Sequence, residues 1–373
     1  MRVVRRLLFI LILVGGVLYS GYVLAGQQLA ARLKQKAAQA EKEVKSLAAR
    51  GGDPSAILAV LKQVKPALDA GDPNRAEALL DRALGMLALA SGDASAPPAY
   101  SQIEPESDLY INPRPVQIDG YDGNAMEPFI STDGRYLFFN NENTPNANTN
   151  LYFAGRTGRL TFHFLGELPG ANSPVLDAVA SIDRAGHFYF TTVREYDRTM
   201  NSIYTGDFDG KSIQNVRPVP GDISPTTPGT INMDASVSPD GQTLFLSRAL
   251  IFPGAPAPRS SQLMIARLQD GAFRIDPGGE RILRNVNTSA LQYAPAITAD
   301  GLELYFTRAS QGGLRILVAT RASTTEPFGE AHVLKSITGF VEAPSVSLDR
   351  QELFFHKKVG DKFALFRAER NPQ

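Results

Sequence analysis

One short pattern occurs five times along this chain. Each copy has an acid or small residue, an apolar pair, a Ser or Thr, an Asp-Gly turn or a variant of it, and then an aromatic strand, and the copies lie at 127–139, 177–190, 234–246, 294–306 and 343–355. A supersecondary unit that repeats at roughly 50 to 60 residues cannot bury its apolar face alone, so its copies must pack against one another. The sequence therefore predicts a closed array of similar units.

Each unit is expected to form a four-stranded antiparallel sheet. Apolar residues alternate with period two on both sides of the Asp-Gly, as in Phe129, Ser131, Tyr136 and Phe138, which predicts a β-hairpin. Third strands are expected at 150–154, 202–206, 262–267, 315–320 and 363–368. Fourth strands are expected at 160–168, 214–219, 280–283 and 331–334. Four strands make one blade, so the predicted fold is an all-β β-propeller.

The last blade lacks a fourth strand of its own, because the sequence reaches Gln373 just after the third. An additional strand is expected upstream of the first copy, at 109–118, and its Asn112-Pro-Arg-Pro-Val resembles the fourth-strand segment Asn215-Val-Arg-Pro-Val. We expect this N-terminal strand to complete the last blade and leave no exposed edge. Five blades are predicted, with six as the alternative.

The repeats resemble the WD-like propeller repeats of the TolB type, in which Pro-x-hydrophobic-Ser-x-Asp-Gly precedes an aromatic strand. The resemblance covers about residues 105–370. The second copy departs from it, with Asp183-Arg-Ala-Gly186 read as an inserted residue, and the fifth has Asp349-Arg350 in place of Asp-Gly. The resemblance implies an extracytoplasmic propeller that binds proteins or other ligands, and it implies no particular catalytic residue.

The charge balance and the cysteine count limit the classes of function. The chain has 38 basic and 38 acidic residues, so no overall field favours nucleic acid, and nucleic-acid binding is not expected. It contains no Cys, which excludes disulfides, thiolate metal sites, thiol catalysis and a lipid-modified Cys.

The N-terminus predicts export. Arg2, Arg5 and Arg6 precede an uncharged, mostly apolar run from Leu7 to Leu24, which is long enough to cross a membrane with its positive flank in the cytoplasm. Residues 1–26 are therefore expected to be a transmembrane anchor in the inner membrane, with the remainder facing the periplasm. A cleaved signal is the alternative, because Val23-Leu-Ala25 followed by Gly26 suits a leader peptidase, and the protein would then be secreted.

A helical segment is expected between this anchor and the propeller, at 27–92. Apolar residues at intervals of three and four over 28–50 predict an amphipathic stalk helix. Asp53-Pro54 and Asp72-Pro73 are start signals for two further helices, which predicts a helical hairpin. Residues 93–104 form the expected linker to a propeller at 105–373, because the stretch 91–99 is rich in Ser, Ala and Pro.

The candidate site is the mouth of the central channel, where the innermost strands of all blades begin. Acids stand there in four blades, together with one Tyr; the candidate ligand-binding residues are Glu127, Asp177, Asp234, Tyr293 and Glu342. Such acids could hold a cation such as Ca²⁺, or supply the acid and base of sugar chemistry. The alternative is that each acid hydrogen-bonds a neighbouring blade and recurs because the blade recurs.

The acids in the turns are interpreted as structural, because their recurrence at one position beside Gly is what a capped hairpin requires; they are Asp133, Asp183, Asp240, Asp300 and Asp349. No His spacing typical of a metal site occurs, nor a Gly-x-Ser-x-Gly elbow, and no cofactor fingerprint is present.

Three hypotheses of function follow. The leading one is an extracytoplasmic propeller that binds or scaffolds an envelope protein or a glycan without catalysis. The rival is a polysaccharide-active enzyme, a glycoside hydrolase or lyase that uses the carboxylates at the channel mouth. A third reading assigns partner docking to the helical hairpin and a purely structural role to the ring.

Overall fold

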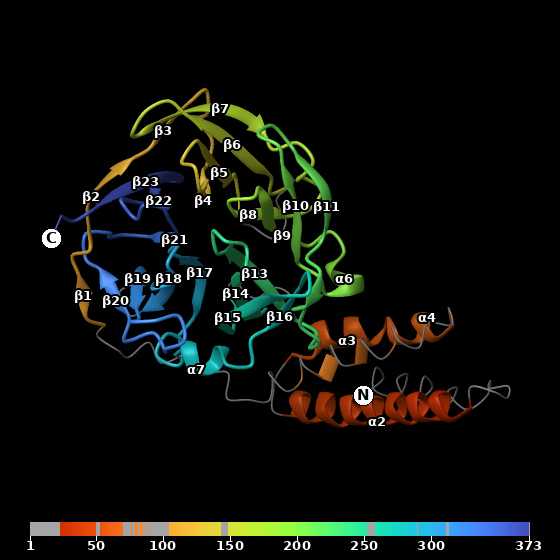
Figure 1. The fold of residues 1–373 in the computed structure, drawn as a ribbon. Coiled ribbons are helices and arrows are strands. Elements are labelled where there is room, and N and C mark those ends of the chain that lie inside the picture. Colours follow the sequence, from red (N-terminus) through yellow and green to blue (C-terminus); the bar gives the residue numbers. More distant parts are fainter. Residues whose placement is uncertain are drawn as a thin grey trace. The chain divides into compact units, whose positions relative to one another are not determined.

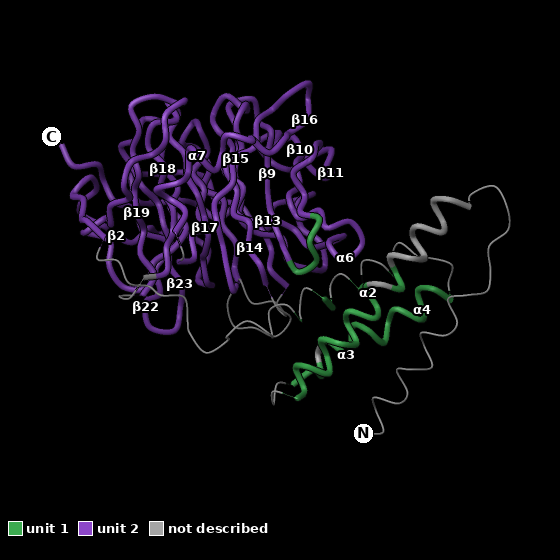
Figure 2. Tube along the Cα trace, turned by 90° about the horizontal axis from the view of Figure 1, so that it is seen from below, with its two compact units in different colours: residues 1–97, 226–229, 252–256 green, residues 98–225, 230–251, 257–373 purple. Residues whose placement is uncertain are grey.

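The structure is a computed structural model. It describes residues 23–49, 53–69 and 104–372, apart from 143–147, 252–257, 289 and 311–312. In the helical region it also describes six separate residues, Ala76, Leu79, Leu80, Ala83, Leu84 and Leu87. The chain divides into two compact units, one formed by residues 1–97 with 226–229 and 252–256, the other by the remaining residues (Figure 2).

The smaller unit is helical. It contains α2 (Val23–Ala49), α3 (Ser55–Leu61) and α4 (Val64–Asp69). Its core consists of apolar side chains at the helical spacing that the sequence predicts, including Leu33, Ala40, Val44 and Leu47 of α2. The described residues of the second hairpin arm, from Ala76 to Leu87, pack into the same core. Asp53 accepts hydrogen bonds from the backbone N–H of Ser55 at 2.9 Å and from its hydroxyl at 2.6 Å, so it caps α3.

Residues 1–22, most of the predicted anchor or signal, lie outside the described residues. Among the helices that are described, none combines the length and the apolar character that a membrane crossing requires.

The larger unit is a five-bladed β-propeller (Figure 1). The first blade is β4 (Met126–Ile130), β5 (Tyr136–Asn140), β6 (Leu151–Arg156) and β7 (Thr161–Glu167). The second is β8 (Asp177–Ile182), β9 (His187–Thr192), β10 (Ile203–Phe208) and β11 (Ile213–Pro218). The third is β13 (Thr230–Val237), β14 (Thr243–Leu250), β15 (Ser260–Gln269) and β16 (Ala272–Ile275). The fourth is β17 (Gln292–Ile297), β18 (Glu303–Ser310), β19 (Gly313–Thr320) and β20 (His332–Leu334).

The fifth blade closes the ring as predicted. Its inner strands are β21 (Val341–Val346), β22 (Glu352–Val359) and β23 (Lys362–Arg370), and its outer strand is the N-terminal β2 (Tyr110–Pro115), antiparallel to β23. Three blades also carry a short parallel strand on the outer edge: β3 (Gln117–Asp119) beside β7, β12 (Gly221–Asp222) beside β16, and β1 (Glu106–Ser107) beside β20.

The propeller core consists of five apolar clusters, each between two adjacent blades. Phe138 packs with Phe188 between the first and second blades, and Phe139 packs near Phe354 between the first and the fifth. The other three clusters join the second to the third blade, the third to the fourth and the fourth to the fifth. Five interfaces close the circle, so the six-bladed alternative is wrong.

One predicted strand is wrong. Residues 280–283 do not form the fourth strand of the third blade; they lie in the helix α7 (Gly279–Leu283). The fourth strand is β16, which follows β15 after the two-residue turn Asp270-Gly271, both with positive φ. Ile282 and Leu283 are buried in the cluster between the third and fourth blades, so their apolar character reflects helix packing. A second short helix, α6 (Tyr196–Thr199), lies between β9 and β10.

Candidate functional site

The innermost strands share a backbone feature where they line the channel. One residue in each has a positive φ between 50° and 55°, and the strand pairing shifts there, which is a β-bulge; these residues are Glu127, Val179, Asp234, Ala294 and Ala343. We call them the channel ring, because all five line one cavity on the propeller axis. The left-handed conformation is costly for residues other than Gly, so its fivefold recurrence requires compensating contacts.

Hydrogen bonds between blades supply that compensation. The N–H of each ring residue donates to a side chain on the second strand of the preceding blade, over 3.0 to 3.3 Å; the acceptors are Asn140, Thr191, Ser247, Thr307 and His356. A β-bulge leaves a backbone N–H outside the ladder, and these acceptors satisfy it.

His356 connects this ring to the acids. Its Nδ1 accepts from the N–H of Glu127 at 3.1 Å, so the neutral imidazole carries its proton on Nε2, which lies 3.1 Å from Oε2 of Glu342. The Tyr293 hydroxyl donates to the other oxygen of Glu342. Glu342 thus accepts from two side chains, one in its own blade and one in the fourth.

Electrostatics join the remaining acids to this group. Burial, with a smaller contribution from the charge of Glu342, raises the pKa of Asp234 to about 6, against the lowering effect of hydrogen bonds from the Ala294 N–H and the Ser247 hydroxyl. Burial also raises the pKa of Tyr293 well above its ordinary value, with additional contributions from the charges of Glu342, Glu127 and Asp234. The structure therefore brings together four of the five predicted site residues: Glu127, Asp234, Tyr293 and Glu342.

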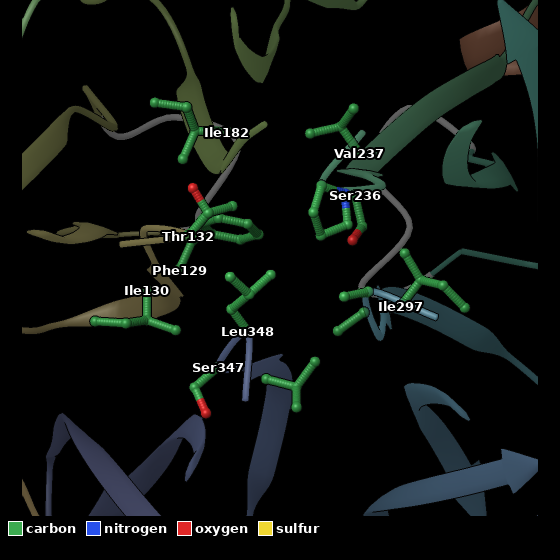
Figure 3. A pocket seen from close by; sticks show the side chains of 13 residues that line it. Phe129, Ile130, Thr132, Ile182, Ser236, Val237, Ile297, Ser347 and Leu348 are labelled. Atoms are coloured by element: carbon green, nitrogen blue, oxygen red, sulfur yellow. The ribbon is translucent and has the colours of Figure 1, made fainter. Parts of the chain in front are cut away.

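The channel itself is narrow. The cavity bounded by the channel ring has a volume of about 20 Å³, which is room for one or two water molecules. At the other end the innermost strands converge on an apolar cavity of about 30 Å³, lined by Ile182, Val237, Ile297 and Leu348 among others (Figure 3). Neither cavity can admit a sugar ring.

Asp177 does not lie with the other acids. Its carboxylate is buried in a salt bridge with Arg194 at 2.6 Å and accepts hydrogen bonds from the N–H and hydroxyl of Ser173. The ring position of the second blade is Val179, two residues later. The prediction that Asp177 stands at the channel mouth is wrong. It took the residue six positions before Asp183, on the assumption that Asp183 is the turn acid of the second blade.

Asp183 does not occupy the turn position of the other acids. The backbone N–H of Asp183 donates to the carbonyl of His187, as the N–H of Ser131 donates to the carbonyl of Tyr136 in the first blade. Asp183 therefore occupies the position at which the other copies have Ser or Thr. The second hairpin is one residue shorter than the others, and no residue is inserted in it. The Asp183 carboxylate accepts from the N–H groups of Ala185 and His187 and from the ring of His187.

The other four turn acids hold their hairpins in one manner. Each accepts a hydrogen bond from the hydroxyl two residues before it, at 2.5 to 2.6 Å, and from the N–H two residues after it, at 3.0 Å; these acids are Asp133, Asp240, Asp300 and Asp349. Such bonds fix an Asx-type turn. All four lie at the end of the innermost strand, away from the channel ring.

An aromatic pair lies beside His356, on the face of the ring where the innermost strands begin, which we call the mouth face. Phe340 is 44% exposed, and its ring lies 5.8 Å from that of Phe363. The Phe363 ring in turn contacts the buried His356 at 5.5 Å. The mouth face therefore presents an apolar platform next to the buried acids.

Sequence reasoning missed His356, although a signal for it exists. His356 follows Ser347 by nine residues, as Ser247 follows Ser238 and Thr307 follows Thr298. Alignment of the copies on this Ser or Thr, instead of on the Asp, would have identified the polar second-strand position. Within the described ranges, no group of three or more His, Cys, Asp or Glu is arranged to hold a metal ion.

Comparison with known proteins gives matches in structure only. No family model matches the chain, and a search of curated proteins finds no match. Similar solved structures include TolB from Acinetobacter baumannii, at 15% identity and a TM-score of 0.37 over 66% of this chain. This chain spans about half of that TolB, 55% of its length.

A putative TolB from Agrobacterium tumefaciens is also similar, at 14% identity and a TM-score of 0.38 over 64% of this chain and 71% of the other. So is the catalytic domain of a GH62 α-L-arabinofuranosidase from Coprinopsis cinerea, at 13% identity and a TM-score of 0.47 over 72% and 98%. The sheet topology of the chain confirms the predicted propeller fold, and TolB proteins are among the solved structures to which the chain is similar.

Proposed function

We propose that this protein is an extracytoplasmic binding module whose propeller recognises an envelope protein or a glycan at its mouth face, without catalysis. The observation that supports this most is how the channel acids are used. Glu342 accepts from Tyr293 and His356, Asp234 accepts from the next blade, and the cavity that the channel ring bounds has a volume of only about 20 Å³. A general acid or base must reach its substrate, and these groups lie below the surface.

The platform of Phe340 and Phe363 is the exposed feature of the same face. Partly exposed aromatic side chains on a rigid ring provide contact area at low entropic cost, which suits either a peptide or the apolar face of a sugar. In the first blade, the second and third strands also meet at the mouth face, through residues 141–142 and 148–150, and loops on a rigid scaffold commonly determine recognition.

A direct binding measurement tests this proposal. Affinity electrophoresis of residues 27–373 against soluble arabinan, galactan and peptidoglycan fragments, with pull-down of purified envelope proteins, is expected to identify a ligand. Phe340→Ala is expected to weaken that binding about tenfold, whereas Leu165→Ala, a similarly exposed apolar residue on β7, leaves it unchanged. Equal effects of the two substitutions would refute a role for the mouth face.

A second candidate function is cleavage of a polysaccharide at the same face. The raised pKa of Asp234, beside Glu127 and Glu342, is the observation that favours it, since a carboxyl with a pKa near 6 can serve as a general acid. The same polysaccharides incubated with the protein are expected to release no reducing ends. Release that Asp234→Asn abolishes would establish the enzyme instead.

The location outside the cytoplasm is part of the proposal. It rests on Arg2, Arg5 and Arg6 before the apolar run Leu7–Leu24, and the absence of Cys is compatible with either compartment. Protease added to spheroplasts of a Gram-negative host is expected to degrade the propeller, and alkali extraction distinguishes an anchored from a cleaved N-terminus.

A further inference from the structure

A groove on the outside of the ring lies at the seam where the N-terminal strand closes it. We call it the seam groove; it lies between β2, β23 and the turn that joins β6 to β7. Its volume is about 420 Å³, compared with about 20 and 30 Å³ for the two cavities of the channel. Pockets of about 300 to 1,000 Å³ are typical of small-molecule sites. It lies toward the end of the blades opposite the mouth face, and it is independent of the function proposed above.

Three arginines from distant parts of the sequence meet in this groove. Arg114 comes from β2, Arg159 from the β6–β7 turn and Arg367 from β23. The one acid that lines it, Glu369, accepts from Asn112 at 2.8 Å and forms an ion pair with Arg159 at 3.2 Å.

The groove keeps a surplus of positive charge. Glu352 lies behind it and is bound by Arg156 through both oxygens and by Arg367 at 2.5 Å. Four arginines, Arg114, Arg156, Arg159 and Arg367, thus face two glutamates. The hydrogen bond from Asn112 lowers the pKa of Glu369, and the charges of Arg159, Arg367 and Arg114 add to the effect, so the field is positive at the groove. Among the described residues, no hydrogen bond or ion pair occupies the guanidinium of Arg114.

The second blade provides an internal comparison. Asn215 in β11 repeats the bulge of Asn112, with φ of 54° against 52°, and donates to Asp207 at 2.8 Å as Asn112 donates to Glu369. Arg217 corresponds to Arg114. In the strand register Arg217 lies opposite Thr205 of β10, whereas Arg114 lies opposite Arg367 of β23. The bulge and its Asn are therefore structural, and the gathering of arginines belongs to the seam.

We propose that the seam groove binds an acidic saccharide through its carboxylate groups. The guanidinium fork of Arg matches a carboxylate in two hydrogen bonds, and Arg114 has its donors available for one. The groove is larger than a single oxyanion requires, and Pro113 and Leu160 line it with apolar surface against which a sugar ring can lie. Arg159, at 70% side-chain exposure, can leave its weak surface pair with Glu369 to bind the ligand.

Calorimetric titration of the full-length chain with trigalacturonate tests the proposal, with neutral maltotriose and inorganic phosphate as comparison ligands. Trigalacturonate is expected to bind, more weakly as NaCl rises from about 0.05 to about 0.5 M, because the site is exposed to screening. Arg114→Ala and Arg159→Ala are each expected to reduce its affinity about tenfold. Arg217→Ala, the matched variant in the second blade, is expected to leave it unchanged.

Each other outcome overturns the proposal. These outcomes are no binding of trigalacturonate, equal binding of maltotriose, phosphate binding as tight as that of the trisaccharide, and equal losses in Arg114→Ala and Arg217→Ala. Arg114, Arg159 and Arg217 are all exposed, so the thermal unfolding temperatures of the three variants are expected to match that of the unsubstituted protein. A loss of binding is then due to the lost contact in the groove and not to unfolding.

Discussion

Asp234 is a channel-ring residue whose negative charge the fold opposes. Its carboxyl has a pKa of about 6 in the folded chain, against an ordinary value of 3.8, because it is buried and lies near Glu342. The folded protein therefore keeps this proton between about pH 4 and pH 6, where the unfolded chain has released it. The free energy of unfolding falls as the pH rises through that window, and the cost of ionising Asp234 is fully present above about pH 6.

Asp234→Asn removes this cost and keeps an oxygen that can accept from the Ala294 N–H. The stability of the variant relative to the unsubstituted protein is expected to rise by about 3 kcal/mol between pH 4 and pH 8, since the shift is about two pKa units. Urea unfolding of both proteins at the two pH values measures the difference. The exposed Asp361→Asn serves as control, and a pH-independent difference for Asp234→Asn would contradict the assignment.

One residue in the turn before the second strand is left-handed in all five hairpins. Four copies have Gly there, and the fifth has Arg350 at φ 63°. Gly134→Ala places a Cβ 3.7 Å from the nearest atom, so only backbone strain opposes it, and it is expected to destabilise the protein by about 1 kcal/mol. Gly134→Asn is expected to cost less, because Asn tolerates this conformation. Thermal unfolding compares the two, and equal losses would argue against strain as the cause.

At the scale of residues, the sequence could place most but not all of the candidate site. Glu127, Asp234, Tyr293 and Glu342 were predicted because they stand at fixed distances from recognisable turns. Asp177 was misplaced because Asp183 substitutes for Ser in a shortened hairpin, and one slip of register moves a residue to another environment.

At the scale of elements, the β-bulge of the innermost strand is the unit that the repeat conserves. Each bulge turns one N–H toward the preceding blade, and a second-strand side chain accepts from it. The acceptors differ in chemistry between blades, so no single residue type marks the position in the sequence. The bulge could not be predicted for this reason, although the strands on either side of it were.

Thr307 tests this contact. Thr307→Val preserves the shape of the fully buried side chain but leaves the Ala343 N–H without its acceptor at 3.0 Å. An unsatisfied buried donor costs about 1 to 3 kcal/mol, so a loss of that size is expected in urea unfolding. Thr307→Ser retains the hydroxyl and removes only a methyl group, and a loss as large as that of the Val variant would show that packing, not the hydrogen bond, is responsible.

The helix α7 shows where strand prediction failed. Glu280-Arg-Ile-Leu283 has the apolar pair that fourth strands share, but the preceding segment, Ala272–Ile275, already fills the outer edge of the third blade. Local pattern alone cannot distinguish a short buried helix from a strand, because periodicity needs more residues than either contains.

At the scale of the whole molecule, closure of the ring is the feature that sequence reasoning predicted best. The unpaired last blade and the additional N-terminal strand required each other, since an open propeller leaves an edge that invites aggregation. The count of five follows from the five apolar clusters between adjacent blades. The helical unit has its own core, so the propeller is expected to fold without it.

The role of β2 in closing the ring can therefore be tested by deleting this strand and adding it back as a peptide. Tyr110 of β2 is fully buried, donates from its hydroxyl to the Arg350 carbonyl at 2.7 Å, and packs edge-on against Tyr305. A chain beginning at residue 98 is expected to be monomeric and stable. A chain beginning at residue 117 exposes the outer edge of β23, and its free energy of unfolding is expected to be lower by at least about 3 kcal/mol, because it loses a large buried aromatic side chain as well as a ladder of hydrogen bonds.

A synthetic peptide of residues 104–116 is expected to restore the stability of the shorter chain in a concentration-dependent manner, measured by thermal unfolding. The same peptide with Tyr110→Ala is expected to fail, and restoration by both peptides, or equal stability of the two chains, would show that β2 is not what closes the ring.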